Sequence, residues 1–428
     1  MTNESPESGK SLRSLFVKNT MWNTAGVSVY LLCQWLITII VVWQYGNYVN
    51  AGYLSLAAGI SGFFYCVASC NMRPFQSSDA TGEYSDSNYV SSRVLTCAVS
   101  IVLCAIFVFS LNYSTVQRSA IMLYMLFRAI EAFADVMHGI DQKHWRMDYI
   151  GISFISRGVL MLGSFVLLGW LYGFLPSLAG LVVTSAAIAF FYDLPKVRGL
   201  AKFSINIGKP VLLLLKRSFP LMIVGLAGVF IIAFTRISVE SIHGTEALGA
   251  YSTVAVPAMI IQAVAMFLLN PLINIFTIYF KESNKRQFLK LFMIAFTAII
   301  GITVVFSAVA VVIGQWGLTI LFSTSIVPYA YLLPGALIGA GLTVMIWFLT
   351  MILSITRNVR SLLFSGLIGA VTVVSTTGLF LVEYGLEGAN ITMIVSQSAA
   401  VLFMLVSFFA ISRKIWIKKP EDAEQQTN

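Results

Sequence analysis

Long apolar stretches recur along the whole sequence, and short polar breaks separate them. Each stretch has about 20 residues, the length that an α-helix needs to cross the hydrocarbon core of a bilayer. The pattern therefore predicts an all-α polytopic membrane protein with about twelve transmembrane helices. These predicted spans lie near residues 21–43, 50–70, 90–111, 119–138, 149–172, 175–192, 217–238, 247–270, 288–313, 329–353, 361–382 and 390–412.

The composition of the chain supports the same class. Hydrophobic residues make up 58% of the chain, charged residues make up 11%, and the mean hydropathy is +0.85. A soluble domain carries roughly 25% charged residues. The five cysteines fall within the first three apolar stretches without a CxxC pair, and the three histidines form no HExxH motif. We therefore expect no disulfide framework, no metal and no cofactor.

The lysines and arginines lie almost all on one side of the predicted membrane. If the amino-terminal tail is cytoplasmic and the spans alternate, only Arg118 of the 27 basic residues falls in an outer break, while Arg128, Arg157 and Arg236 fall within spans. Because cytoplasmic breaks are enriched in Lys and Arg, both termini are predicted to be cytoplasmic. The net charge of +9 therefore indicates orientation in a membrane and not affinity for nucleic acid.

Two of the cytoplasmic breaks contain several basic residues. The break after the second span is expected to hold Arg73 and Arg93, and the break after the sixth, "DLPKVRGLAKFSINIGKPVLLLLKR", is the longest and most basic. The longest break divides the spans into six and six, as in transporters built from two helical halves. The predicted parts are an amino-terminal six-helix bundle at 1–195, a cytoplasmic connecting loop at 196–216, and a carboxy-terminal six-helix bundle with a short cytoplasmic tail at 217–428.

Charged residues within the spans are the main candidates for function. A charge at the centre of a membrane helix costs roughly 2.5–3.5 kcal/mol, so its side chain is expected to face protein or water. Arg128, Glu131 and Asp135 step by three and four residues, which places them on one face of the fourth span. On the fifth span Ser153 and Arg157 also share a face. The short loop between the two spans makes them antiparallel neighbours.

Polar residues of other spans extend this pattern. On the first span Asn23, Tyr30 and Gln34 share a face, and Arg236 lies near the outer end of the seventh span. Each half therefore offers basic groups to a common interior. The functional interpretation is a water-filled central cavity whose arginines bind an anionic ligand, because a guanidinium pairs with phosphate through two hydrogen bonds.

The alternative interpretation is that these charges neutralise one another. Arg128 and Glu131 are three residues apart on one helix, and Arg157 could pair with Asp135 across helices. Arg236, close to the interface, could instead extend toward water. Glu131 and Asp135 have two open roles: they could bind a proton or sodium ion that drives transport, or they could be charge partners of the arginines.

Two segments carry a resemblance to a known family. They are "FRAIEAFADVMHGIDQKHWRMDYIGISFISRG", which leads from the fourth span into the fifth, and "GTEALGAYSTVAVPAMIIQ", which opens the eighth. With these segments and its arrangement of twelve spans with little loop, the chain resembles the Wzx-type polysaccharide flippases. These flippases are relatives of the multidrug and toxin extrusion transporters in the multidrug/oligosaccharidyl-lipid/polysaccharide exporter superfamily.

The resemblance implies two six-helix bundles around a central cavity in a bacterial inner membrane. It also implies a function: movement of an undecaprenyl-pyrophosphate-linked oligosaccharide from the cytoplasmic to the outer leaflet, for O-antigen, capsule or related polymers. The implied partners are this lipid-linked substrate, the bilayer, a polysaccharide polymerase and chain-length proteins. Family members use basic cavity residues, and Arg128, Arg157 and Arg236 are the positions that match this role, with Asn23 and Gln34 as further cavity residues.

Three other classes are weighed against this one. A cation-coupled multidrug exporter of the same fold would favour acidic cavity residues, and the three arginines within spans count against it. The major facilitator fold usually carries a GxxxDRxGRR-like loop, which "NMRPFQSSDATGEYSDSNYV" does not match. A membrane enzyme such as a polysaccharide polymerase or ligase commonly has a large outer loop, and no predicted outer loop is long. The chain is therefore expected not to be an enzyme.

Overall fold

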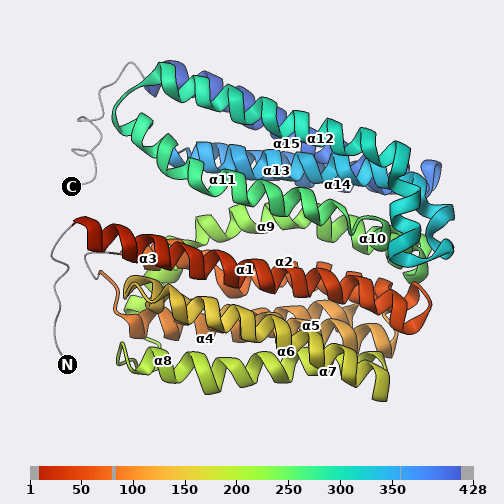
Figure 1. Ribbon diagram of the computed structural model, residues 1–428, viewed down its shortest axis with the longest axis horizontal. Helices are drawn as coiled ribbons and strands as arrows, with labels where there is room; N and C mark the ends of the chain where they lie inside the picture. The colour runs from red at the N-terminus through yellow and green to blue at the C-terminus, as the bar shows by residue number, and fades with distance from the viewer. Residues whose placement is uncertain (1–8, 80–82, 357, 416–428) are drawn as a thin grey trace. The chain divides into compact units, whose positions relative to one another are not determined.

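A computed structural model describes residues 9–79, 83–356 and 358–415 (Figure 1). These residues form helices joined by short turns, and no strand occurs among them. The all-α fold predicted from the apolar pattern is therefore confirmed. The predicted cytoplasmic tail beyond Ile415 lies outside the described residues.

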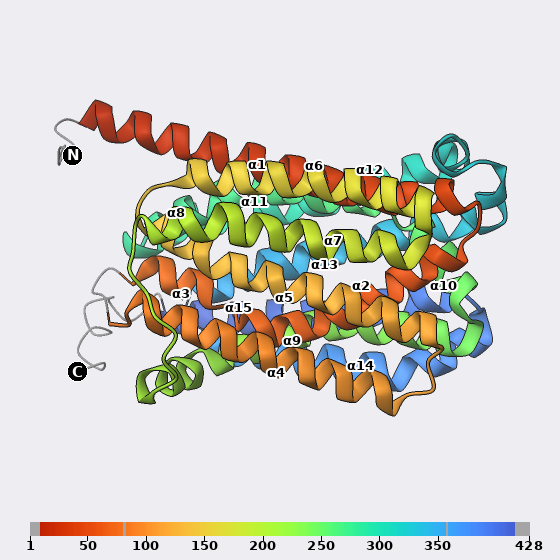
Figure 2. The same cartoon turned by 90° about the horizontal axis from the view of Figure 1, so that it is seen from below.

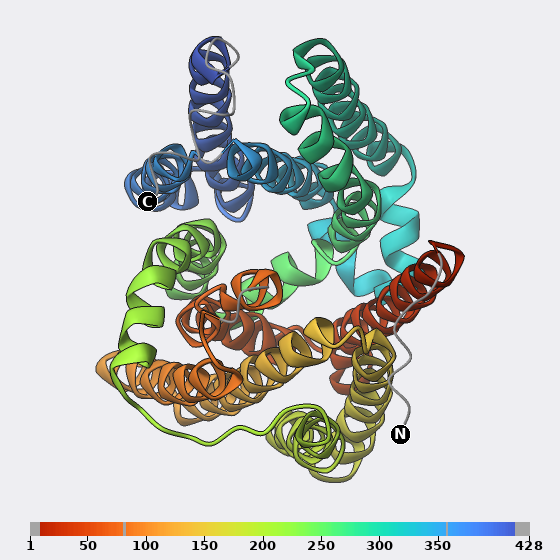
Figure 3. The same ribbon diagram turned by 90° about the vertical axis from the view of Figure 1, so that its left-hand side faces the viewer.

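The chain divides into two compact units, which are described separately. The first unit comprises Met1–Gly46 and Leu56–Gly225, and the second comprises Asn47–Ser55 and Leu226–Asn428. The division into bundles at 1–195 and 217–428 remains a prediction. Figure 2 shows the long helices within each unit lying side by side, and Figure 3 views them nearly end on.

Nine helical elements begin in the first half of the chain. They are α1 (Gly9–Tyr45), α2 (Val49–Ser69), α3 (Met72–Ser78), α4 (Asp86–Ser110), α5 (Thr115–Lys143), α6 (Met147–Tyr172), α7 (Phe174–Ile188), the π-helix η1 (Ala189–Asp193) and α8 (Leu194–Arg198). The backbone between α8 and the next helix is irregular from Gly199 to Gly208 and is the longest such connection described.

The remaining elements follow this connection. They are α9 (Lys209–His243), α10 (Thr245–Val254), α11 (Ala258–Lys281), α12 (Lys285–Phe322), the 3₁₀ helix η2 (Thr324–Leu332), α13 (Leu333–Ile355), α14 (Val359–Tyr384) and α15 (Glu387–Ile415). Both α2 and α9 pass from one unit into the other.

The described helices account for most of the twelve predicted spans. In the described part of the chain ten helices are long and apolar enough to cross a membrane, and α10 with the start of α11, bent by 50°, makes an eleventh. α5 has 29 residues, but Arg128, Glu131 and Asp135 lie in its middle and keep it out of this group. Counted by its length, α5 is the twelfth.

The surface of these helices suits a bilayer. In the most apolar stretch of α12 only 6% is buried, and the exposed side chains of this helix include Val311 and Val312. Several helices also end in exposed aromatic residues, as helices do at a membrane interface. These aromatic residues are Trp43, Trp170, Tyr172, Trp316 and Tyr384. The chain is therefore a multi-pass membrane protein.

Within the first unit, α1 packs along α6 through glycines. A Cβ atom added at Gly26 would lie 2.6 Å from the Cα atom of Gly151, and one added at Gly151 would lie 2.5 Å from the carbonyl oxygen of Trp22. Small residues allow this approach, which supplies the van der Waals contact that holds helices together in lipid. The side chain of Asn19 also donates to the carbonyl of Trp145, at 3.0 Å. α6, which carries Arg157, is thereby held against α1.

Candidate functional site

The face of α5 that carries Arg128, Glu131 and Asp135 forms the centre of the site. Arg128 and Glu131 make an ion pair along the helix, and the guanidinium carbon of Arg128 lies 3.9 Å from the centre of the Tyr65 ring on α2. The pairing of Arg128 with Glu131 that the sequence allowed is therefore present. The Arg128 side chain is 24% exposed and Glu131 is buried. Arg128 is the charge of this pair that remains accessible.

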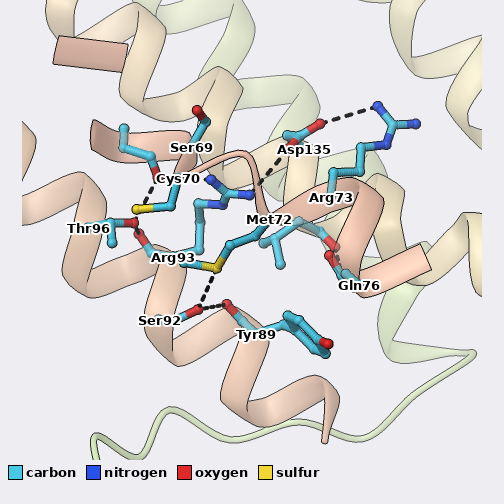
Figure 4. A network of polar contacts seen from close by, with 12 residues as sticks. Ser69, Cys70, Met72, Arg73, Gln76, Tyr89, Ser92, Arg93, Thr96 and Asp135 are labelled. Carbon is cyan, nitrogen blue, oxygen red and sulfur yellow. Dashed lines mark hydrogen bonds and ion pairs between the residues drawn. The ribbon is translucent and has the colours of Figure 1, made fainter. Parts of the chain in front are cut away.

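Asp135, one turn further along α5, is bound by two arginines (Figure 4). Nη1 of Arg73 on α3 lies 3.2 Å from one carboxylate oxygen, and Nη2 of Arg93 on α4 lies 3.3 Å from the other. Arg93 also donates to the carbonyl oxygen of Ala68, at 2.8 Å. The carboxylate is thus a charge partner for both arginines.

The prediction that Arg93 lies in a cytoplasmic break was wrong. The residue lies within α4, and its side chain is completely buried. The sequence favours a break here because Arg93 stands close to the start of the predicted span at 90–111, where a charge is usual. A buried arginine needs a carboxylate and carbonyl acceptors, and Asp135 and Ala68 supply them.

The short helix α3 places Arg73 beside Asp135. Gln76, which is fully buried, donates to the carbonyl oxygen of Val136 on α5 at 3.1 Å. At the end of α3 the carboxylate of Asp79 accepts hydrogen bonds from the backbone of Glu83 and Tyr84. Burial raises the pKa of Asp79, but these hydrogen bonds outweigh it, so the pKa lies below its usual value. Asp79 therefore stays charged and fixes the turn.

Arg157 is held in a second buried network. Its Nη2 atom lies 2.8 Å from the carboxylate of Asp193, and the other oxygen of that carboxylate lies 3.8 Å from Nε2 of His138. His138 also contacts the hydroxyl of Ser153, at 3.2 Å. The alternative partner suggested by the sequence, Asp135, is bound by other arginines, so that pairing was wrong.

Asp193 owes its position to η1, the π-helical turn that follows α7. Such turns insert a residue into a helix, so they shift which side chains face a neighbouring helix, and they are frequent at functional sites. Asp193 and His138 were missed in the sequence. Asp193 lies one residue beyond the predicted span at 175–192, and His138 is the last residue of the span at 119–138.

The candidate residues of α1 lie near the same helices. Nε2 of Gln34 donates to the hydroxyl of Tyr30 at 2.8 Å, so these two residues do share a face. The ring of Tyr30 packs against Phe154 on α6, with ring centres 5.4 Å apart. Asn23 is half-buried on α1. Its place in a cavity, and that of Gln34, remains a prediction.

Arg236 belongs to the second unit. It lies on α9, is half-buried, and its Nη1 atom is 3.4 Å from the carbonyl oxygen of Ser55 on α2. Arg128 and Arg157 belong to the first unit. A cavity shared by all three arginines therefore remains a prediction.

Comparison with known proteins gives a family match over part of the chain and a fold. Residues 75–274 match the family model described as "Polysaccharide biosynthesis protein". This range contains Arg128, Arg157 and Arg236. No curated protein sequence matches the chain.

Solved structures of transporters have a similar fold. A mutant of the Vibrio cholerae MATE transporter VcmN is 14% identical, with 96% of this chain and 99% of that chain covered and a TM-score of 0.60. A MOP superfamily transporter from Pyrococcus furiosus is 14% identical, with 93% and 95% covered and a TM-score of 0.59. The chain therefore has the fold of the MATE transporters. The family match adds a likeness to polysaccharide biosynthesis proteins over residues 75–274.

Proposed function

We propose that the protein moves a lipid-linked oligosaccharide, carried on undecaprenyl pyrophosphate, from the cytoplasmic to the outer leaflet of a bacterial inner membrane. The observation that carries this proposal is that one range, 75–274, matches a polysaccharide biosynthesis family and contains the three arginines that the sequence predicts to lie within spans, Arg128, Arg157 and Arg236. The product would supply the synthesis of surface polymers such as O-antigen or capsule. A polymerase and chain-length proteins would then act on it as partners.

The chemistry of the substrate explains the arginines. A polyisoprenyl pyrophosphate has an anionic head that needs cationic donors inside the protein, and a hydrocarbon tail that can remain in the bilayer. A guanidinium binds phosphate through two hydrogen bonds and keeps its charge when buried. Arg128 is our candidate for direct contact, because its side chain is partly accessible and its ring partner Tyr65 holds it in place.

Arg157 and Arg236 are proposed as further anion-binding groups, and Asn23 and Gln34 as polar groups for the sugar. Arg157 is only 2% exposed and is paired with Asp193, so binding there requires that pair to open. The contacts of Glu131 and Asp135 favour a role as charge partners over the binding of a driving cation.

The polarity of the binding pocket differs among transporters of related fold. The Pyrococcus furiosus protein is described as a MOP superfamily transporter whose binding pocket of reverse polarity suggests a different function. One fold can therefore carry pockets of different charge. A multidrug exporter of the same fold remains the competing function, and its cationic compounds would be repelled by Arg128.

Deletion of the gene distinguishes these functions. Under the proposal, uncleaved lipid-linked repeat units accumulate on the cytoplasmic leaflet, and susceptibility to cationic drugs is unchanged. A multidrug exporter would instead give increased drug susceptibility with normal surface polymer. A polymerase or ligase would leave repeat units accumulating on the outer leaflet, and the purified protein would make a polymerised or hydrolysed product.

A further inference from the structure

Asp135 is shared by two arginines that lie in different environments (Figure 4). The side chain of Arg93 is completely buried and also donates to the carbonyl oxygen of Ala68. The side chain of Arg73 is 25% exposed. The carboxylate therefore joins a cation that is fixed in the interior to one that can reach water.

The group of three charges is unbalanced. Two guanidiniums face one carboxylate, which leaves one positive charge in excess. If Arg73 leaves Asp135, the carboxylate still has Arg93 as its partner, and no buried charge is left unpaired. If Arg93 were removed, the carbonyl of Ala68 would lose one of its two donors and keep the hydroxyl of Thr96, and Asp135 would lose its buried partner. The excess charge is therefore available at Arg73 and not at Arg93.

Arg73, on α3, contacts α5 at Asp135, so its distance from Arg128 can be followed along α5. Its partner Asp135 is seven residues from Arg128 on the same helix, which corresponds to about 10 Å at the rise of an α-helix. The connection between α2 and α4, which contains α3 and Arg73, is predicted to be cytoplasmic. An anion that enters from the cytoplasm would meet Arg73 before it meets Arg128.

We propose that Arg73 is the first pyrophosphate-binding residue on the cytoplasmic side, and that Asp135 occupies this arginine until substrate phosphate replaces it. This inference rests on the proposed function. Asp135 is then an internal competitor of the substrate, while Arg93 keeps its charge balanced throughout. Arg128 receives the pyrophosphate next.

Arg73 and Arg93 bind the same carboxylate, so substitution of each gives a matched pair of variants for a binding experiment. Purified protein in detergent would be titrated with farnesyl pyrophosphate, with farnesol as the phosphate-free control, and the apparent Tm would be measured for each variant. Arg73→Gln should weaken farnesyl pyrophosphate binding by at least about tenfold, the change expected from losing a charge-assisted hydrogen bond. Its Tm should stay near that of the parent. Arg93→Gln should lower the Tm by several degrees.

Replacement of the carboxylate tests competition directly. Asp135→Asn should lower the Tm, because the buried Arg93 loses its carboxylate, but the folded variant should bind farnesyl pyrophosphate as tightly as the parent or more tightly, because Arg73 is released. Equal weakening by Asp135→Asn and Arg73→Gln would mean that the pair is structural and would overturn the inference. A large fall in Tm or a failure to fold for Arg73→Gln would overturn it as well.

The parent protein separates this inference from the function on which it rests. A parent that binds farnesyl pyrophosphate no better than farnesol would contradict the proposed function itself. A parent that prefers the pyrophosphate, with Arg73→Gln binding like the parent, would overturn only the role of Arg73. Preference in the parent, loss in Arg73→Gln and retention in Asp135→Asn would support both.

Discussion

Arg157 on α6 and Asp193 at the end of η1 form an ion pair inside the first unit, with 2.8 Å between Nη2 and the carboxylate oxygen. Both side chains are almost completely withdrawn from solvent. In such a setting the attraction between two charges offsets the cost of removing them from water only while both are present. The pair therefore links α6 to the end of α7, and each partner depends on the other.

Single substitutions in this pair should destabilise the protein. Arg157→Gln or Asp193→Asn should each cost about 3 kcal/mol, because the remaining charge is left buried without its partner. Thermal unfolding in detergent would measure the loss as a lower apparent Tm. The double variant Arg157→Leu with Asp193→Leu should recover most of it. Recovery of stability without recovery of polymer export would fit the proposed anion-binding role of Arg157, and full recovery of export would refute that role.

The pair of Arg128 and Glu131 should behave differently. Arg128→Lys should lose much of the export, because an ammonium replaces a two-pronged donor, and Arg128→Ala should lose nearly all of it. If Arg128 only neutralised Glu131, removal of both charges would restore export. We expect Arg128→Ala with Glu131→Ala to stay inactive.

Surface polymer and membrane abundance would be measured together in a strain that lacks the native gene. The double variant should reach the membrane at the parent's level, so that its inactivity reports on binding. Export like that of the parent would show that the charged face of α5 is structural, and the substrate site would then lie elsewhere.

The contact between α1 and α6 can be tested with two glycines of the same helix. Gly151→Ala would place a Cβ atom 2.5 Å from the carbonyl oxygen of Trp22, and overpacking of this kind costs about 1–3 kcal/mol. Gly163, also on α6, has no neighbouring atom within 4 Å of such a Cβ. Gly163→Ala should therefore leave the apparent Tm unchanged. Equal effects from the two variants would argue against the close approach of α1 and α6.

Much of the fold could be predicted because the bilayer fixes the length and polarity of each helix. The fourth span was found despite three charges in its middle, since its apolar residues continue on both sides of them. The short helix α3 and the π-helical turn η1 could not be predicted. Both depend on packing against neighbouring helices and not on a periodic pattern.

The site was only partly predictable for a similar reason. Arg128 and Glu131 lie three residues apart, so helix geometry alone brings them together. Arg93 is separated from Asp135 by 42 residues and Arg157 from Asp193 by 36 residues, and only tertiary packing can join them. Charges near the ends of apolar stretches are also assigned to loops by default, as Arg93 was.

Topology is tested by cysteine labelling in a background with the five native cysteines replaced. Ser241→Cys and Glu383→Cys lie at exposed positions near helix ends that are predicted to face outward, and Lys202→Cys lies in the predicted cytoplasmic connection. These positions are chosen instead of the nearby Gly244 and Gly385, because both glycines have positive φ values and a side chain there would strain the backbone. An impermeant maleimide should label the first two in intact cells and not the third. Labelling of all three would contradict the predicted orientation.

The central claim is relocation of a lipid-linked pyrophosphate oligosaccharide without bond cleavage, and reconstitution tests it most directly. Purified protein would be placed in liposomes that hold such a lipid with a fluorescent sugar, and an impermeant quencher would report how much of the label crosses to the other leaflet. The parent should increase this crossing while the lipid stays chemically intact, and Arg128→Ala with Glu131→Ala at the same density should not. Absence of crossing with the parent, or release of a cleaved or polymerised sugar, would contradict the account.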